Sequence, residues 1–146
     1  MNGKLLAIAW KEKPRAPMLT AERAIIDREA GLPGDFRGRS PDAQITIVFA
    51  EDWAQACREL GADVPWLARR ANLLVAGIAN PQSAGGIVRI GAATLEIMSE
   101  TDPCSRMDAA HQGLRAALTP QWRGGVRTRV LEGGGIGVGD AVRLEA

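Results

Sequence analysis

The 146-residue sequence has only two cysteines, one histidine and no long apolar run. Cys57 and Cys104 belong to no CxxC or Cys/His spacing, which argues against zinc and iron–sulfur sites. Because His111 is the only histidine, a histidine-rich metal centre is excluded, and a Ser-His-Asp or Cys-His site would have to use it. The apolar stretches are too short to span a bilayer, and the N-terminal apolar run stops too early for a signal peptide. We therefore expect a cytoplasmic protein in a reducing setting.

The sequence also lacks an excess of charge of either sign. Eighteen Lys and Arg residues stand against 17 Asp and Glu residues, for a formal net charge of +1. A near-neutral chain is a poor candidate for bulk electrostatic binding to nucleic acid or to an acidic membrane, so we expect neither partner. Lysine is scarce, and arginine supplies most of the positive charge. Arginine suits bidentate recognition of anions, although a GC-rich genome produces the same bias.

The remaining composition is that of an ordinary globular protein, with 46% hydrophobic and 24% charged residues. This length fits one domain over residues 1–146, and the sequence shows no repeat or linker that would divide it. Strands are expected over residues 4–10, 19–28, 44–49, 72–76, 87–90, 93–98, 126–131 and 138–144. The run 19–28 is also compatible with a short helix, and the glycine-rich run 133–137 is expected to be a flexible hairpin loop.

Helices are predicted over residues 51–60 and about 105–118, with a short one within 64–70. The first ends before Gly61, which suits the left-handed position that follows a helix. Its inner face is expected to comprise Trp53, Ala54, Cys57 and Leu60. The inner face of the second helix is expected to comprise Met107, Ala110, Leu114, Ala117 and Leu118. No βαβ alternation runs through the chain, so we predict a mostly β, largely antiparallel barrel with two to three peripheral helices.

Cys104 is the leading candidate for chemistry. It lies at the predicted junction between a strand and the second helix, which is expected to begin with either Asp102 or Ser105 as its cap. The helix N-terminus and Arg106 favour a thiolate, whereas Asp102 and Glu100 oppose it. Cys104 is therefore a reactive thiolate, a persulfide carrier or a soft metal ligand, or else a half-buried structural cysteine.

Clustered arginines are the second candidate feature. Arg69 and Arg70 precede a predicted strand, and Arg123, Arg127 and Arg129 surround a pair of glycines. Glycine lets backbone N–H groups approach an oxyanion, so this cluster can form an anion pocket. The alternative is solvated surface, with Arg127 and Arg129 on one exposed strand face.

An ordered series of short motifs covers most of the chain, from Gly34 to Leu144. The series comprises Gly34-Asp35, Ile45-Thr46-Ile47, Leu60-Gly61, Arg69-Arg70-Ala71-Asn72-Leu73-Leu74-Val75, Ile90-Gly91-Ala92-Ala93-Thr94-Leu95-Glu96, Pro103-Cys104, Arg123-Gly124-Gly125-Val126, Arg129-Val130-Leu131 and Val138-Gly139-Asp140-Ala141-Val142. In order and spacing it resembles a MOSC domain. This module occurs at the C-terminus of eukaryotic molybdenum cofactor sulfurases and as small stand-alone bacterial proteins.

The resemblance implies a β-barrel-like fold with peripheral helices and a family cysteine, which Cys104 matches. That cysteine is proposed to carry sulfur or to ligate molybdenum in a pterin cofactor, and related proteins reduce N-hydroxylated bases at molybdenum. A thiolate suits molybdenum as a soft ligand, and arginines suit the phosphate of the pterin. We therefore expect molybdenum cofactor (molybdopterin) binding, with Cys104 as the metal ligand or sulfur carrier. Arg70, Asn72, Arg106 and Arg123 are expected around the anionic pterin.

The sequence departs from the family pattern near both candidate features. Phe36 and Arg37 follow Gly34-Asp35, where many relatives have a histidine, and Thr101-Asp102 stands where some have a second cysteine. Since no flavin, haem or iron–sulfur motif is visible, a reductase would need a separate electron-donor protein, and a sulfur carrier a sulfur-donor protein. The alternative interpretation, from another class, is a non-catalytic small-anion-binding or protein-interaction domain on the same barrel.

Overall fold

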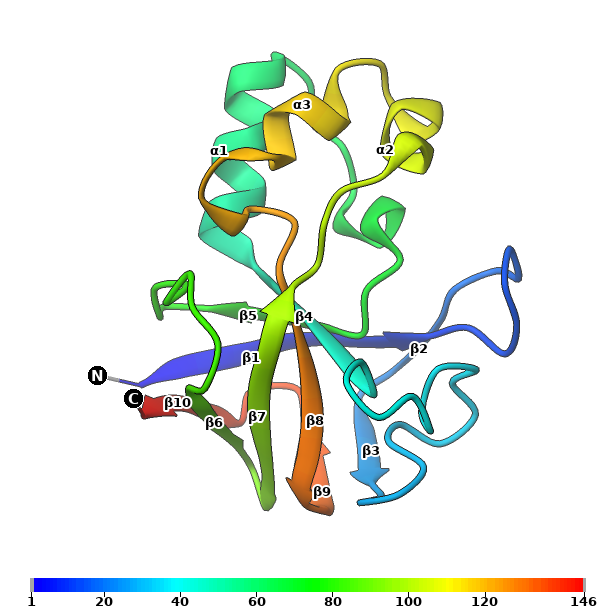
Figure 1. Ribbon diagram of the computed structural model, residues 1–146, viewed down its shortest axis with the longest axis vertical. Coiled ribbons are helices and arrows are strands. Elements are labelled where there is room, and N and C mark those ends of the chain that lie inside the picture. Colours follow the sequence, from blue (N-terminus) through cyan, green and yellow to red (C-terminus); the bar gives the residue numbers. More distant parts are fainter. Residues whose placement is uncertain (1, 146) are drawn as a thin grey trace.

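The computed structural model describes residues 2–145, and within them seven strands close into a barrel (Figure 1). The ring order is β10 (Ala141–Glu145), β6 (Ile87–Ile90), β7 (Ala93–Glu100), β8 (Val126–Glu132), β4 (Ile45–Phe49), β5 (Leu73–Ala76) and β1 (Gly3–Trp10), which pairs with β10 to close the ring. Only the β4–β5 pair of this ring is parallel in the described chain. The predicted mostly β, largely antiparallel barrel is confirmed.

Strand periodicity explains why the barrel has an apolar interior. On β8, Val126, Thr128 and Val130 are buried, while the alternate residues Arg127 and Arg129 point outward. The buried Thr128 hydroxyl donates a 2.7 Å hydrogen bond to a carbonyl of β4, so its burial leaves no unpaired group. The barrel core includes Leu5, Ile8, Ile47, Phe49, Leu73, Ile90, Leu95 and Ile97.

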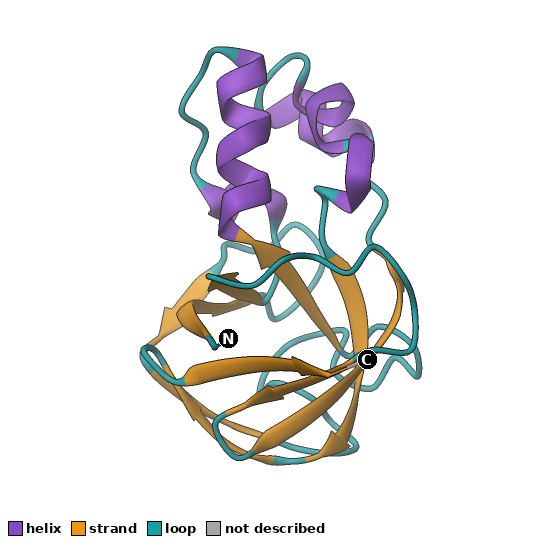
Figure 2. Ribbon diagram, turned by 90° about the vertical axis from the view of Figure 1, so that its left-hand side faces the viewer, coloured by secondary structure: helices purple, strands orange, loops and turns teal. Residues whose placement is uncertain are grey.

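Three helices lie at one end of the barrel, within residues 2–145 (Figure 2). They are α1 (Ala50–Leu60), α2 (Ser105–Ala110) and α3 (Leu114–Leu118), accompanied by the 3₁₀ turns η1 (Trp66–Arg69) and η2 (Pro120–Trp122). A second apolar cluster joins this layer to the barrel and includes Val48, Trp53, Ala56, Met107, Leu114 and Leu118. No helix in the described part of the chain is both long enough and apolar enough to cross a membrane.

The prediction of one helix over residues 105–118 was wrong, because the chain breaks into α2 and α3. Gly113 has a φ of +90°, a left-handed conformation that interrupts the helical path. Oδ1 of Asp108 accepts hydrogen bonds from the backbone N–H groups of Gly113 at 3.2 Å and Arg115 at 3.1 Å. Asp108 therefore stabilises the start of α3. Neither Asp102 nor Ser105 caps α2, whose N-cap position is occupied by Cys104.

A close backbone approach at Gly134 explains a further difference from expectation. The run 133–137 is not a flexible loop, because β9 (Gly134–Gly137) pairs with β3 (Arg23–Ile26) in a small separate sheet. A Cβ on Gly134 would lie 2.7 Å from the carbonyl oxygen of Ala92, so only glycine fits this close approach. The run 19–28 is extended as expected but divides into β2 (Leu19–Ala21) and β3.

Helix α1 ends at its C-terminus as predicted, but one residue of its buried face differs from the prediction. Gly61 follows α1 with a φ of +74° and donates its N–H to the carbonyls of Cys57 and Arg58. Ala56 is buried and Ala54 is exposed, the reverse of the predicted inner face. The face is otherwise as expected, with Trp53 buried and Cys57 half-buried.

Candidate functional site

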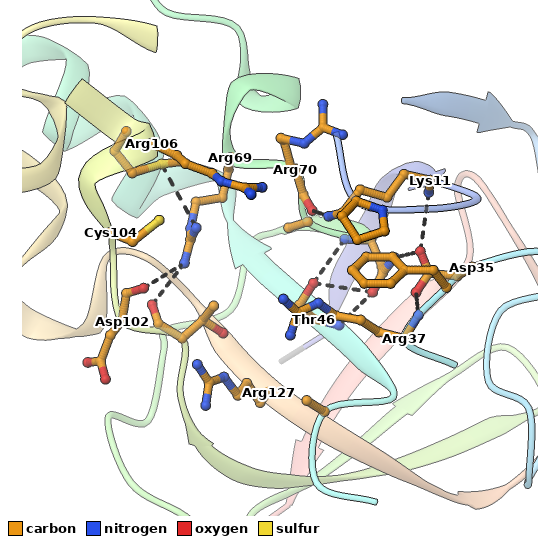
Figure 3. Close-up of a pocket in the computed structure, with 17 residues that line it drawn as sticks. Lys11, Asp35, Arg37, Thr46, Arg69, Arg70, Asp102, Cys104, Arg106 and Arg127 are labelled. Carbon is orange, nitrogen blue, oxygen red and sulfur yellow. Dashed lines mark hydrogen bonds between the residues drawn. The ribbon is translucent and has the colours of Figure 1, made fainter. Parts of the chain in front are cut away.

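A cavity of about 450 Å³ opens where β1, η1, the loop after Gly34 and the start of α2 meet (Figure 3). Its lining carries six cationic side chains and two carboxylates, and we call it the cationic cavity. The cations are Lys11, Arg37, Arg69, Arg70, Arg106 and Arg127, and the carboxylates are Asp35 and Asp102. Since the whole chain has a net charge of only +1, positive charge is concentrated at this one place.

Cys104 lies at one end of the cationic cavity. It follows β7 after a short connection and precedes the first residue of α2, so the predicted strand-to-helix junction is confirmed. Its thiol is free and exposed. Figure 3 shows the sulfur turned toward the guanidinium of Arg69. An exposed thiol that opens on a positively charged cavity is suited to bind a soft metal or to carry sulfur.

Arg69 is buried behind Cys104, with 7% of its surface exposed. Its Nε donates a 2.8 Å hydrogen bond to the carbonyl of Gly124, and its Nη2 donates to the carbonyls of Thr101 at 3.0 Å and Asp102 at 3.4 Å. Burial lowers the pKa of Arg69, while the nearby Cys104 and the Asp102 carboxylate act in the opposite direction. This guanidinium therefore fixes the segment that carries Cys104 to the segment before β8.

Whereas Arg69 lies within η1, Arg70 follows η1 in a left-handed backbone conformation, with a φ of +61°. Its Nη2 donates to the carbonyl of Ala16, and its own carbonyl accepts a 3.0 Å hydrogen bond from Nζ of Lys11. Its Nε is buried and has no hydrogen-bond partner in the described part of the chain. A buried donor left unpaired beside a cavity fits an anionic ligand that would accept its hydrogen bond.

Lys11 extends the positive charge at the end of the cavity away from Cys104. Burial, followed by the charge of Arg70, lowers its pKa from 10.5 to about 8, and Asp35 opposes this shift. The ring of Phe36 lies close to two cations, with Nζ of Lys11 5.3 Å and the guanidinium carbon of Arg37 5.0 Å from its centroid. The aromatic face partly compensates the gathering of like charges.

Asn72 organises this part of the cavity through its side-chain amide. Its Oδ1 accepts hydrogen bonds from the N–H of Thr46 at 2.9 Å and from the hydroxyl of Thr46 at 3.2 Å. Its Nδ2 donates to the carbonyl of Ala9 at 3.1 Å and to Oδ1 of Asp35 at 3.4 Å. Asp35 also accepts from the backbone N–H groups of Lys11 and Arg37. Asn72 lines the cavity as a positioning residue, because its polar atoms are already committed.

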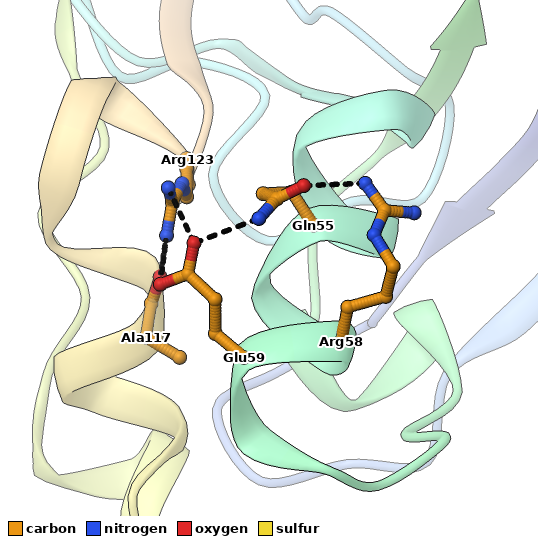
Figure 4. A network of polar contacts seen from close by, with 5 residues as sticks. All are labelled: Gln55, Arg58, Glu59, Ala117 and Arg123. Carbon is orange, nitrogen blue, oxygen red and sulfur yellow. Dashed lines mark hydrogen bonds and ion pairs between the residues drawn. The ribbon is translucent and has the colours of Figure 1, made fainter.

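The structure does not bring Arg123 to the cationic cavity. Its buried guanidinium pairs with Glu59, with Nη2 to Oε2 at 2.9 Å, and donates to the carbonyl of Ala117 at 3.0 Å (Figure 4). The hydrogen bond from Arg123 is the main cause that lowers the pKa of Glu59, and a second one from Gln55 adds to it. Arg123 therefore joins α1 to α3, while Arg70, Asn72, Arg106 and Cys104 all line the cavity.

Three cavity residues were not identified from the sequence. Lys11 and Arg37 carry no motif of their own, and Asp35 resembles an ordinary turn residue after glycine. For Lys11, the scarcity of lysine and its position directly after a strand were the available signals, whereas Asp35 and Arg37 stand in or just after the Gly34-Asp35 motif. Arg127 was expected either in an anion pocket or on an exposed strand face, and it lies half-buried at the cavity wall.

The donor set at Cys104 limits the kind of metal centre that fits. Within residues 2–145, no group of three or more His, Cys, Asp or Glu side chains is placed to hold a metal ion. A metal at Cys104 would therefore need its other ligands from a cofactor. One soft thiol and the unpaired Nε of Arg70, in a cavity rich in cations, fit an anionic cofactor that brings its own metal ligands.

Known structures share this fold at low sequence identity. The YuaD protein from Bacillus subtilis is 18% identical, with a TM-score of 0.81 over 100% of this chain and 97% of that one. YiiM from Geobacillus stearothermophilus is 20% identical, with a TM-score of 0.75 over 99% of this chain and 75% of that one. YiiM from Escherichia coli is 17% identical, with a TM-score of 0.70 over 100% and 70%.

Sequence comparison gives the family directly. No curated protein matches the chain. The MOSC domain family model matches residues 34–143, which include the loop at Asp35, η1, Cys104 and most of the barrel. The chain therefore belongs to the MOSC domain family.

Proposed function

We propose that this protein binds molybdenum cofactor in the cationic cavity, with Cys104 as the thiolate ligand of the metal or as a persulfide-carrying sulfur. The observation that carries the proposal is the exposed Cys104 thiol at one end of a cavity lined by six cations. Membership of the MOSC family supports it. The molybdenum cofactor is anionic, since it carries a phosphate, and molybdenum is a soft enough metal to favour sulfur ligands.

The roles of the remaining residues follow from their contacts. The unpaired Nε of Arg70 and the ammonium of Lys11 would bind the phosphate at the end away from Cys104. Arg106 would add charge near the sulfur, and Asn72 would keep Asp35 and Lys11 in place. We do not assign Arg123 to the cofactor, because Glu59 and Ala117 occupy its guanidinium.

The bound cofactor would supply two-electron redox chemistry next to Cys104. In that form the protein is a small oxidoreductase that takes electrons from a separate donor protein, and the reducing setting of the cytoplasm suits its free thiols. In the carrier form, the Cys104 thiolate would attack the outer sulfur of a persulfide on a donor protein, forming the Cys104 persulfide and releasing the donor's thiolate, and would later pass that sulfur to an acceptor in the same way. Both forms require the thiol to be free and accessible, which agrees with its exposure.

The test is elemental analysis of protein produced in a host that makes the cofactor. Molybdenum and sulfane sulfur are measured for the parent protein, for Cys104→Ala and for Cys57→Ala as the matched control. Molybdenum near one per chain that disappears only in Cys104→Ala supports the metal-ligand role, and sulfane sulfur without metal that disappears in the same variant supports the carrier role. Neither signal in the parent, or equal signals in all three proteins, would overturn the proposal in favour of a non-catalytic anion-binding or interaction domain.

A further inference from the structure

Two arginines on β8 differ in how their charge is balanced. Arg129 pairs with Glu96 on the neighbouring strand, with Nη2 to Oε1 at 2.7 Å and Nε to the same oxygen at 2.8 Å. Arg127 lies two positions earlier on the same strand, and its partner across β7 is Ser99, which carries no charge. In the described part of the chain, Arg127 has no side-chain hydrogen bond and no ion pair. The strand therefore presents one neutralised guanidinium and one free guanidinium, and the free one lines the cationic cavity.

The other two arginines near Cys104 are also without a carboxylate partner. Arg69 donates only to neutral acceptors, which are three backbone carbonyls and the sulfur of Met107. Arg106 is exposed, lines the cavity and forms no ion pair within residues 2–145. Figure 3 shows Arg69 and Arg106 on one side of Cys104 and Arg127 on another wall of the same cavity.

The phosphate of a cofactor would not balance this charge. A phosphate carries about −1.5 to −2 charges near pH 7. Lys11, Arg37 and Arg70, opposed by Asp35, already offer a net charge of two at the opposite end of the cavity. At the Cys104 end, the lining formed by the described chain opposes three guanidiniums with the carboxylate of Asp102 and the thiol itself, while Glu100 lies beside Asp102 outside the lining. A cavity with an uncompensated charge attracts ligands of the opposite sign.

We propose that the Cys104 end of the cavity selects a small anionic reactant, such as a carboxylate or another oxyanion-bearing compound, and that Arg106 and Arg127 determine this specificity. The inference deepens the proposed function, on which it rests for the identity of Cys104 as the reacting or metal-binding group. Arg69 contributes charge from behind the sulfur and also holds the Cys104 segment in place. Arg106 and Arg127 are free to contact a reactant because no other group occupies their guanidiniums in the described chain.

The experiment uses Cys104 as a reporter in metal-free protein that carries Cys57→Ser, so that one thiol remains. The rates of alkylation by iodoacetate, an anion, and by iodoacetamide, a neutral analogue, are measured at one pH. Both reagents attack the same sulfur, so the ratio of the two rates cancels the intrinsic reactivity of the thiol and reports the local electrostatic potential. The same ratio for a small free thiol serves as the reference.

We expect the ratio for Cys104 to exceed that of the free thiol by about three- to tenfold at low salt and to fall toward it at about 0.5 M salt. Arg106→Gln and Arg127→Gln should each lower the ratio by about two- to fivefold. Arg129→Gln is the matched control, because it removes an arginine from the same strand outside the cavity, and it should leave the ratio unchanged.

Two results would overturn the inference. One is a ratio for Cys104 equal to that of the free thiol. The other is a ratio that Arg129→Gln lowers as much as Arg127→Gln does, which would indicate a general effect of surface charge. Neither measurement involves molybdenum, so a high ratio in a protein that binds no molybdenum would leave this inference standing while the proposed function fails. A low ratio in a protein that binds molybdenum through Cys104 would overturn this inference and leave the proposed function standing.

Discussion

Nε of Arg69 donates a 2.8 Å hydrogen bond to the carbonyl oxygen of Gly124, fifty-five positions later in the chain. The same guanidinium holds Thr101 and Asp102, so three segments that are distant in sequence meet at one buried side chain. The arrangement depends on a planar group with several donors in fixed directions, which arginine has and lysine lacks. The position of Cys104 is thus set by a residue that the sequence suggested only as a general anion-binding candidate.

Replacement of Arg69 by Met should lower the free energy of unfolding by about 2–4 kcal/mol, because it leaves buried carbonyls without donors. Arg69→Lys should recover only part of this loss, since one ammonium cannot reach all three carbonyls. Urea denaturation followed by circular dichroism measures both. Arg106→Met is the control, because the exposed Arg106 has no such bonds in the described chain and should cost less than about 0.5 kcal/mol. Equal losses in the Arg69 and Arg106 variants would contradict the role of Arg69.

Gly125→Ala should destabilise the fold by more than about 3 kcal/mol or prevent folding. Gly125 has a φ of +103°, and a Cβ at this position would lie 2.2 Å from the carbonyl oxygen of Ile47. Gly135→Ala is the matched control, because nothing lies within 4 Å of its Cβ position. The control should change the free energy of unfolding by no more than about 0.5 kcal/mol. Thermal unfolding compares the two variants, and similar melting temperatures would show that the contact at Gly125 relaxes freely.

Binding of sulfate to the metal-free protein should weaken as the pH rises from 7 to 9. The pKa of Lys11 is about 8, so its positive charge is lost across this range, whereas the charge of sulfate is constant. Calorimetric titration at both pH values should show a several-fold loss of affinity for the parent. Lys11→Gln should bind sulfate weakly at both pH values, and Lys4→Gln, which changes an exposed lysine on β1, should behave as the parent does. A pH dependence that persists in Lys11→Gln would assign it to another group.

The lowered pKa of Lys11 also determines how the stability of the fold changes with pH. The pKa of Lys11 in the fold, about 8, is lower than its usual value of 10.5, so the unfolded chain binds more protons between these two values. Stability therefore gains from this residue as the pH rises through that window, and below pH 8 its charged form opposes folding. Lys11→Gln should remove this contribution to the slope of stability against pH, which chemical denaturation at pH 7, 8.5 and 10 would detect.

The Glu59–Arg123 pair should make the stability of the fold depend on pH in the acidic range. The pKa of Glu59 is lowered from its usual 4.5, mainly by the hydrogen bond from Arg123, so its contribution is complete above pH 4.5 and is lost as the pH falls through the lower folded value. Glu59→Gln should flatten the melting temperature between pH 5 and 3. Arg123→Met should cost more than Glu59→Gln at pH 7, because Arg123 is buried and also holds the carbonyl of Ala117. Parallel pH profiles for the parent and Glu59→Gln would contradict this interpretation.

Prediction from the sequence succeeded where the signal was local. The alternation of Arg127 and Arg129 with apolar residues identified β8, the apolar run at 44–49 identified β4, and Gly61 identified the end of α1. It failed where a distant contact decides the outcome. The glycines of β9 look like a flexible loop until β3 lies beside them. The helix predicted over 105–118 breaks at a local feature instead, because His111 is extended and Gly113 is left-handed.

In the candidate site, too, local signals identified some residues, and distant contacts placed the others. Cys104 could be located because it directly precedes a helix, and Arg70 because it precedes a strand beside Asn72. Arg123 sits among similar residues in the sequence, yet its guanidinium turns to Glu59 on α1. Lys11 reaches the cavity through tertiary packing alone, by way of the carbonyl of Arg70 and the carboxylate of Asp35. No pattern within a few residues of Lys11 encodes these contacts.

The single parallel pair of the described barrel, β4 with β5, has a consequence for how the binding site is acquired during folding. Parallel neighbours need a long crossover, and here that crossover carries α1 and η1 and delivers Arg69 and Arg70 to the cavity. Lys11, Arg70 and Cys104 come together only after this crossover has packed and the strands around it have paired. Contacts between such distant positions form slowly and late. A partly folded chain with native helices and an open sheet would therefore lack the cavity, and capture of a ligand would report completion of the fold rather than any step before it.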